Sequence, residues 1–264
     1  MLPIAWLGLA LLAAPALAQD SEPEPEFARN GPYVGVGGVF LHPGDWTGDF
    51  ENNFEGDATR IATKNAESFL SQNQPNAVLN PPQAAIQLSG TDLDEMWGVG
   101  GVLGWRVSPH LGLELEGEWI AGSNQSSFRV DNTGDPGTVE IDDLWTITAN
   151  VRVYPLTGRV QPFAVAGVGV QHARFDAYGR SVGNTTTGEV GNPPVPIAGI
   201  PADFELRDRK TKTDGALRAG VGLDVYLTPQ VAGELKVDYV IPFVPTGLVT
   251  TDYLSVRLGL LYRF

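Results

Sequence analysis

The most informative pattern along this chain is an alternation of apolar and polar residues with a period of two. In the terminal segment, one face carries Arg257 and Arg263. The opposite face is apolar and consists of Val256, Leu258, Leu260, Tyr262 and Phe264. Successive side chains of a strand point to opposite sides, so this period predicts a β-strand. An apolar face opposite a charged one is typical of a strand with lipid on one side and a polar lumen on the other.

Eight segments of the chain have a strand-like composition and are bounded by turn residues. They lie at 32–41, 95–107, 111–121, 143–154, 160–173, 216–227, 231–243 and 252–264. Three connections are tight turns, at 108–110, 156–159 and 228–230, and the others are longer, at 42–94, 122–142, 174–215 and 244–251. Outer-membrane barrels have short periplasmic turns and long extracellular loops. The sequence therefore predicts an all-β fold, an eight-stranded antiparallel up-and-down transmembrane β-barrel with both termini in the periplasm.

The first residues have the features of a secretory signal peptide. An apolar run at 4–14 is broken by Pro15 and followed by a small-residue cleavage site at 16–18. No Lys or Arg precedes the run, which is unusual for such a signal. We expect a signal peptide at 1–18, an acidic periplasmic linker at 19–31 that does not pack, and one barrel domain at 32–264 whose long loops are extracellular.

Composition narrows the possible functions. The formal net charge of -14 argues against binding to nucleic acid. The chain contains no cysteine, which excludes disulfide bonds and thiolate chemistry. After the signal peptide, no stretch approaches about 18 consecutive apolar residues, so a helical span is not expected. We therefore expect the chain to cross the membrane with strands that close into a barrel.

When the alternation is extended through all the strands, it places charged side chains of both signs in the lumen. The bases are Arg106, Arg152, Arg218, Lys236, Arg257 and Arg263. The acids are Glu114, Glu116, Glu118, Asp224, Glu234 and Asp238. Unpaired buried charges are costly, so we expect these side chains to form a self-neutralising network. The network is either a narrow charge-selective passage for small solutes or a filled plug, and we favour the plug because side chains alone can fill an eight-stranded interior.

Several segments resemble the eight-stranded outer-membrane barrels of the outer membrane protein A and opacity type, a porin family. The resemblance is carried by 31–38, 100–119, 158–169, 220–229 and the terminal strand. It implies a place in the outer membrane of a Gram-negative cell envelope, contact with outer-membrane lipids and lipopolysaccharide, and a structural or surface-exposed role. It also implies luminal ion pairs at Glu114 and Asp224, whereas Glu234 and Lys236 have signs exchanged relative to the family pattern. We do not expect the periplasmic peptidoglycan-binding domain that some relatives carry.

The resemblance further implies that the terminal strand carries the signal read by the barrel-assembly machinery. The residues of this signal are Leu258, Leu260, Tyr262 and Phe264. Tyr262 and Phe264 are also expected in the aromatic girdle at the membrane interface. The end of the chain is therefore expected to act in assembly as well as in membrane anchoring.

Candidate catalytic residues are few. The histidines are His42, His110 and His172, and no recognised triad motif accompanies them. We therefore expect no enzymatic activity, no cofactor and no metal centre. The alternative is a lipid-modifying or proteolytic barrel that uses His42 or His172.

The long loops contain three weaker signals, each with two interpretations. In loop 42–94, Asp57 would cap a short helix that reaches Leu70, or the loop is disordered. Residues 131–135, with acids at 140, 142 and 143, carry oxygen ligands suited to calcium, but they lack the spacing of the known calcium loop, which favours a solvated acidic loop. The third signal is a group of basic residues, Arg207, Arg209, Lys210 and Lys212. These residues would bind lipopolysaccharide phosphates, or they are ordinary solvated charges.

Overall fold

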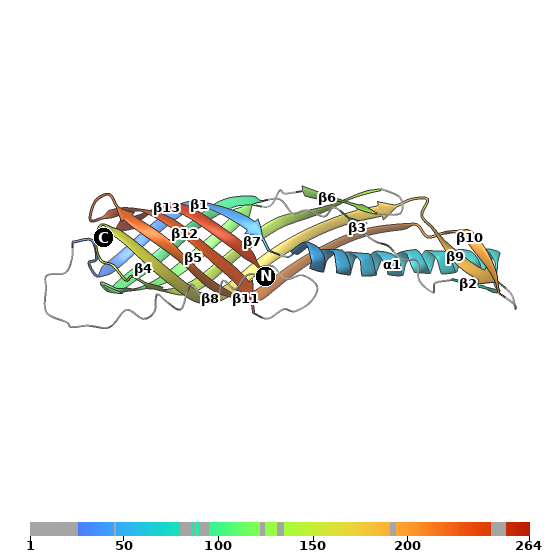
Figure 1. Ribbon diagram of the computed structural model, residues 1–264, viewed down its shortest axis with the longest axis horizontal. Helices are drawn as coiled ribbons and strands as arrows, with labels where there is room; N and C mark the ends of the chain where they lie inside the picture. The colour runs from blue at the N-terminus through green and yellow to red at the C-terminus, as the bar shows by residue number, and fades with distance from the viewer. Residues whose placement is uncertain are drawn as a thin grey trace.

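Eight antiparallel strands form a closed ring in the computed structural model of the protein (Figure 1). They are β1 (Gly31–Pro43), β4 (Met96–Ser108), β5 (Leu111–Ala121), β7 (Pro136–Val153), β8 (Val160–Ser181), β11 (Phe204–Tyr226), β12 (Val231–Pro242) and β13 (Tyr253–Arg263). Each ring strand pairs with the ring strand that precedes or follows it in the chain, and β1 pairs with β13 to close the ring. The predicted eight-stranded up-and-down barrel is confirmed.

The structure describes residues 26–44, 46–79, 86, 88–89, 95–121, 125–130, 135–190, 194–243 and 252–264. The expected signal peptide at 1–18, most of the expected linker and the loop at 244–251 lie outside these residues. Within the described residues, no helix combines the length and the apolar character needed to cross a membrane.

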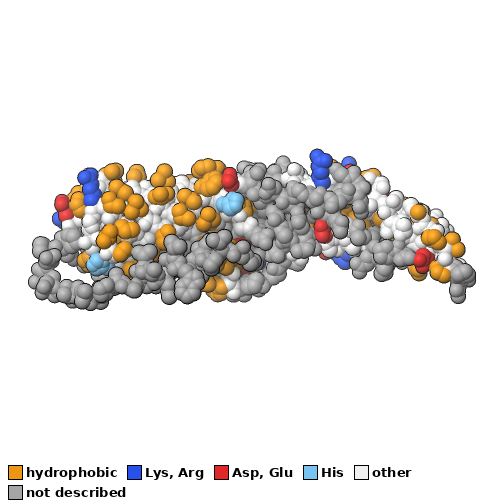
Figure 2. All heavy atoms as spheres, viewed as in Figure 1, with side chains coloured by type: hydrophobic (Ala, Val, Ile, Leu, Met, Phe, Trp, Pro, Cys, Tyr) orange, Lys and Arg blue, Asp and Glu red, His pale blue; other side chains and the backbone are white. Residues whose placement is uncertain are grey.

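The ring strands follow the alternation read from the sequence. On β12, Glu234, Lys236 and Asp238 are buried, whereas Leu235 between them is 48% exposed. Figure 2 shows apolar side chains covering the outer surface of the ring. Exposed aromatic side chains mark both ends of this surface, with Trp97, Trp119 and Tyr239 at one end and Trp105, Tyr262 and Phe264 at the end with the tight turns. An apolar band between two aromatic girdles is the surface of a barrel in a membrane.

Three strands continue well beyond the ring, which corrects the predicted loops 122–142 and 174–215. β7 begins at Pro136, β8 extends to Ser181, and β11 begins at Phe204. The register of β8 and β11 continues from Asp224↔Gln161 in the ring to Phe204↔Ser181 at the far end. This part of β11 carries charged residues on both faces, so it lacks the apolar face that marks a membrane strand. The pattern therefore predicted a loop where the chain forms a solvent-exposed ribbon.

A long helix lies against this ribbon. α1 spans Trp46–Asn73, so it begins well before the predicted start, and Asp57 lies in its interior rather than at its cap. Asp57 instead pairs with Arg60, with 3.2 Å between Oδ1 and Nη2. The buried face of α1 has an apolar residue at every fourth position, and these residues are Phe54, Ala58, Ala62, Ala66 and Leu70.

The helix and the long strands enclose a second hydrophobic core outside the ring. A small sheet covers it, with β10 (Val195–Pro201), β9 (Thr185–Val190) and β2 (Ala77–Leu79) in that order. β6 (Gln125–Val130) pairs with β7, and β3 (Leu88–Ser89) pairs with β6. Phe54 and Phe128 meet edge to face in this core, with 5.2 Å between their ring centroids. We call α1, the strands β2, β3, β6, β9 and β10, and the parts of β7, β8 and β11 outside the ring the extension; Figure 1 shows it projecting from one end of the barrel.

Three successive layers of side chains fill the interior of the ring. Next to the tight turns is an aromatic layer of Tyr33, Tyr154, Phe163 and Tyr226. Charged side chains occupy the middle. Toward the extension is an apolar layer that consists of Val39, Leu41, Met96, Ile120, Ile141, Leu144, Ala173, Ala216, Val240 and Tyr253. The strand registers place the layers in this order because each strand contributes every second residue to the lumen.

Candidate functional site in the barrel lumen

The structure buries all the charged side chains that the alternation places in the lumen. Each of the twelve is at most 6% exposed. They come from β4, β5, β7, β11, β12 and β13, and they are Arg106, Glu114, Glu116, Glu118, Arg152, Arg218, Asp224, Glu234, Lys236, Asp238, Arg257 and Arg263. The period of two is sufficient to place them, because a strand in a closed ring has one face toward the lumen.

Arg152 organises the part of the lumen next to the aromatic layer. Its guanidinium contacts Glu114 at 2.8 Å, Glu234 at 2.8 Å and Asp224 at 3.4 Å. The same group lies over the ring of Phe163, 3.9 Å from the centroid. One cation therefore holds carboxylates from three strands, β5, β11 and β12.

Two tyrosines of the aromatic layer donate to these carboxylates. The Tyr154 hydroxyl donates to Asp224 at 3.3 Å, and the Tyr33 hydroxyl donates to Glu114. The ring of Tyr33 crosses Gly104, where a Cβ atom would overlap it. Glycine at this position therefore lets the Tyr33 hydroxyl reach across the lumen. Neither tyrosine was among the predicted site residues, although both follow the inward parity of β1 and β7.

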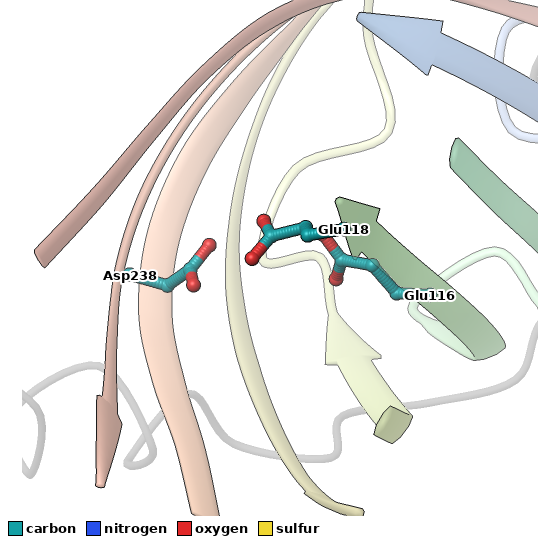
Figure 3. Close-up of side chains that lie close together, drawn as sticks. All are labelled: Glu116, Glu118 and Asp238. Carbon is teal, nitrogen blue, oxygen red and sulfur yellow. The ribbon is translucent and has the colours of Figure 1, made fainter. Parts of the chain in front are cut away.

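Arg218 organises the part of the lumen next to the apolar layer. It contacts Glu116 at 2.9 Å, Glu118 at 2.6 Å and Asp238 at 3.1 Å. Figure 3 shows these three carboxylates turned toward one another, and their oxygen atoms lie within 4.8 Å. Such a group has the ligand atoms of a cation site. Here the Arg218 guanidinium contacts all three acids, so the side chain supplies the positive charge that a metal ion would otherwise bring.

Lys236 and Arg257 join the two parts. Lys236 pairs with Glu116 and lies 2.8 Å from Asp238. Arg257 lies 2.5 Å from Glu116 and also pairs with Glu234, which Arg152 holds on its other side. The ion pairs thus form one connected charge network of six acids and four bases, made of Glu114, Glu116, Glu118, Asp224, Glu234, Asp238, Arg152, Arg218, Lys236 and Arg257.

The remaining two predicted bases, Arg106 and Arg263, stand apart from the network, which corrects the expected balance of six and six. Within the described residues, neither forms an ion pair with a carboxylate. Arg106 donates to Gln161 at 2.6 Å and to the Pro109 carbonyl. Arg106 and Arg263 both lie close to the tight-turn end of the ring. The alternation predicted that they face the lumen, but it does not predict how far along the barrel axis they lie.

The apolar layer was not predicted, although a signal for it was present. Ile120 follows Glu118 in the inward phase of β5, and Val240 follows Asp238 in the inward phase of β12. Both are fully buried. Tyr253 at the same level donates its hydroxyl to Glu118 at 3.2 Å, so the boundary between the layers is hydrogen-bonded. On both strands the inward-facing residues change from charged to apolar toward the extension. This change in the sequence marks where the polar part of the lumen ends.

Two of the histidines, His110 and His172, bond to structural groups. His110 lies in the turn between β4 and β5, and its Nδ1 is 2.8 Å from the Tyr154 carbonyl oxygen. His172 on β8 stacks on Trp145 and lies 2.7 Å from the Thr213 hydroxyl. His42 is exposed near the end of β1. The structure therefore brings no two of these histidines together.

The acidic residues of the candidate calcium loop that the structure describes include two that accept hydrogen bonds from other parts of the fold. Residues 131–134 of the proposed calcium loop lie outside the described residues. Asp135 accepts a hydrogen bond from the Val182 amide at 2.9 Å, and Asp143 accepts one from the Trp119 indole at 2.9 Å. Both carboxylates therefore fix the backbone or a girdle side chain.

The predicted basic group is divided between the two faces of β11. Arg207 and Arg209 both bond to Asp176 on the neighbouring strand β8, at 3.0 Å and 2.6 Å. These bonds hold the pKa of the Asp176 carboxyl below its usual value. Lys210 pairs with Asp208 at 2.5 Å, and Lys212 pairs with Asp214 at 3.0 Å. Because side chains alternate along a strand, the arginines and the lysines point to opposite sides, and they form no single basic patch.

Comparison with known proteins places the chain among membrane barrels. Residues 4–264 match the outer membrane protein beta-barrel domain. No curated protein matches the chain. Similar solved structures include the outer membrane protein OprG from Pseudomonas aeruginosa, at 14% identity and a TM-score of 0.48, with 90% of this chain and 98% of that chain covered. The attachment invasion locus protein Ail of Yersinia pestis, in complex with the heparin analogue sucrose octasulfate, has 14% identity, a TM-score of 0.41 and coverages of 89% and 99%.

The outer membrane protease OmpT from Escherichia coli has 8% identity, a TM-score of 0.40 and coverages of 90% and 97%. The match over residues 4–264 covers the whole described barrel and its extension. The chain belongs to the outer membrane protein β-barrel family.

Proposed function

We propose that this protein is a structural and surface-exposed protein of the outer membrane, with a closed lumen that does not conduct solutes. In this proposal the tight turns face the periplasm and the extension faces the outside of the cell, as in other outer-membrane barrels. The barrel anchors the extension, and the extension is the part that meets the surroundings.

The observation that carries the proposal is the order of layers in the lumen. A small ion that entered from the turn end would meet the aromatic layer and then the charge network, where each cation already contacts at least two carboxylates. Beyond the network it would meet the apolar layer, which offers few polar partners. An ion that loses its water without gaining partners pays a large free-energy cost, and apolar constrictions close pores by excluding water.

The extension supports a surface role because it is built as a folded unit. α1 buries Ala58, Ala62 and Ala66 completely against the long strands and the small sheet. Asn65 on α1 donates to the Asp203 carbonyl at 2.7 Å, which fixes the helix to the segment just before β11. A helix that was only loosely attached to the barrel would have neither the buried face nor this bond.

A liposome-swelling assay with sugars and amino acids of increasing size tests the proposal. We expect liposomes that contain the wild-type protein to swell no faster than empty ones. Liposomes that contain a wide, water-filled porin are the positive control. Ile120→Ser together with Val240→Ser tests whether the apolar layer alone limits swelling. Leu235→Ser on the lipid-facing side of β12 is the matched control. Swelling with wild-type protein that depends on solute size would contradict a closed lumen and favour the small-solute channel.

The same proposal assigns no catalytic role to the barrel. It rests on the bonds of His110 and His172, which tie these side chains to structural partners. Comparison of the lipid profile and the surface-protease activity of a deletion strain and its parent tests this point. A lost lipid species or a lost cleavage activity, restored by the wild-type gene and not by His172→Ala, would contradict it.

A further inference from the structure

Among the described residues, the mouth of the barrel at the tight turns contains two buried arginines that form no ion pair with a carboxylate. Arg106 is fully buried and Arg263 is 6% exposed. Within the described residues, their partners are neutral: Gln161 and the Pro109 carbonyl for Arg106, and the Tyr226 hydroxyl and the Phe27 carbonyl for Arg263. Both side chains lie at the tight-turn end of the ring and carry the same charge. Each of the four bases in the charge network contacts at least two carboxylates. The local charge at the tight-turn end is therefore positive, unlike that of the network.

Each of these guanidinium groups also has one N–H donor without a hydrogen-bond acceptor among the described residues. In the described part of the chain, Nε of Arg106 and Nε of Arg263 are buried and have no hydrogen-bond partner. A buried donor that bonds to nothing costs free energy, and a buried cation without a counter-charge costs more. An anion that accepts from these groups would remove both costs.

A small hollow lies at the same place. Its walls are Tyr33, Tyr154, Tyr226, Gln230, Leu261 and Arg263. Arg106 lies behind one of these walls, with its guanidinium carbon 3.8 Å from the centroid of the Tyr154 ring. Gln230 lies in the exposed turn between β11 and β12, so the hollow is next to solvent. The hollow therefore combines a guanidinium group in its wall, the charge of a second guanidinium behind the wall, and access from outside.

The N-terminal segment contacts two walls of this hollow, Arg263 and Tyr226. The Phe27 carbonyl accepts hydrogen bonds from Arg263 at 2.9 Å and from Gln161 at 2.7 Å. The Phe27 ring packs on Tyr226, with 5.8 Å between the centroids, and Ala28 beside it is fully buried. One backbone carbonyl thus supplies partial negative charge where no carboxylate of the described residues pairs with Arg263.

We propose that this mouth is a binding site for a small inorganic anion of about the size of chloride, held by Arg263, favoured by the charge of Arg106 and covered by Phe27. The site is separate from the charge network, because the aromatic layer lies between them. It gives the barrel an anion-dependent closure at its turn end: the anion lowers the repulsion between the arginines and thereby stabilises the covered state.

The natural absence of cysteine makes the test direct. A single Gln230→Cys substitution puts a thiol at the hollow, and Leu156→Cys puts a control thiol in the exposed turn between β7 and β8. The rates of modification by a negatively charged and a positively charged methanethiosulfonate of similar size are compared at both positions. The quantity compared is the rate with the negative reagent divided by the rate with the positive one. We expect this quotient to be about tenfold higher at Gln230→Cys than at Leu156→Cys, because a positive local potential concentrates anions to this extent.

Chloride is then varied against gluconate at constant ionic strength. Bound chloride competes with the negative reagent, so its rate at Gln230→Cys is expected to fall and then level off as chloride rises, whereas the rate at Leu156→Cys stays constant. Arg263→Gln in the Gln230→Cys background removes the preference. Phe27→Ala raises the rates of both reagents, and that of the negative reagent more. If Arg263→Gln does not fold, chloride competition in the otherwise unchanged protein still decides. Equal rate ratios at the two thiols, or rates at Gln230→Cys that do not respond to chloride, would overturn the proposal.

Discussion

Arg218 on β11 and Glu118 on β5 form a two-pronged ion pair across the lumen, with Nη1 2.9 Å from Oε1 and Nη2 2.6 Å from Oε2. The two strands are not neighbours in the ring, since β7 and β8 lie between them on one side. The pair therefore links opposite walls of the barrel. Both terminal guanidinium nitrogens bond to the carboxylate, and this bidentate geometry is stronger than a single contact.

Removal of one partner of this pair is expected to be costly. Arg218→Ala leaves Glu116, Glu118 and Asp238 with too little positive charge in a buried site. We expect it to lower the free energy of unfolding by about 3–5 kcal/mol, measured by urea titration in lipid vesicles. Leu217→Ala on the lipid-facing side of β11 is the matched control. If the double variant Glu118→Gln/Arg218→Ala is no more stable than Arg218→Ala alone, stranded charge is not the cause of the loss.

The lipid-facing side of β5 gives a second prediction. Leu115 is 53% exposed on the outer surface, and Glu116 beside it is fully buried in the lumen. Leu115→Arg would place a charge in lipid, which costs about 2–4 kcal/mol near the middle of the bilayer. The measurement is the folded fraction after insertion into vesicles, seen as heat-modifiable migration. Leu115→Ala controls for the loss of the leucine. Insertion of Leu115→Arg as efficient as that of Leu115→Ala would show that this face is not in lipid.

The terminal strand gives a prediction about assembly. Leu258, Leu260, Tyr262 and Phe264 all lie on the outer face, and Phe264 is 71% exposed. Because little of the Phe264 ring is buried, its loss has a small effect on stability. If it belongs to a signal for the assembly machinery, Phe264→Ala slows assembly in cells by several-fold and leaves spontaneous folding into vesicles unchanged. Val34→Ala, on the neighbouring strand and also exposed, is the control. Equal losses in cells and in vesicles would point to a structural role alone.

The extension gives a prediction about pH. Bonds from Arg207 and Arg209 favour the charged form of Asp176 and hold its pKa below the ordinary value of 3.8. A carboxyl whose pKa is lowered by folding contributes stability above its unfolded pKa and loses that contribution as the pH falls through its folded pKa. We therefore expect the ribbon of β8 and β11 beyond the ring to loosen only below about pH 4.

Carbon NMR of the Asp176 carboxyl measures this directly. The midpoint is expected below 3.8 in the wild type and closer to 3.8 when Arg207 and Arg209 are both replaced by glutamine. Arg180→Gln removes a charge from the same face of β8 without removing a bond to Asp176, and is expected to leave the midpoint nearly unchanged. A wild-type midpoint at or above the ordinary value would contradict the bonds to Asp176.

Much of the barrel follows from the sequence because membrane strands obey a simple rule. Leu235, Val237 and Tyr239 alternate with Glu234, Lys236 and Asp238, and this alternation requires lipid on one side and a lumen on the other. The extension does not follow from the same rule. Around Lys210 and Lys212 the two faces of β11 are similar in polarity, so nothing local distinguishes a strand from a loop there. Its pairing with β8 depends on long-range contacts.

The alternation also predicts which side chains face the lumen, but not which of them pair. Parity shows that Arg106 and Arg218 both point inward, but the partner of each depends on its depth in the lumen and on the stagger of the strands. Arg218 lies at the level of Glu118, whereas Arg106 lies at the level of Gln161. Phe27 contacts Arg263 although they are 236 positions apart in the chain. No periodic pattern contains that contact.

The central claim is that the lumen is closed, and single-channel recording in planar lipid bilayers tests it most directly. With purified wild-type protein in concentrated potassium chloride, we predict no discrete conductance steps after verified insertion. A wide, water-filled porin in the same bilayers confirms that inserted open barrels are detected. Reproducible steps from the wild-type protein, with an ion selectivity that changes in Glu116→Gln, would show that ions pass through the charge network, and would contradict the account.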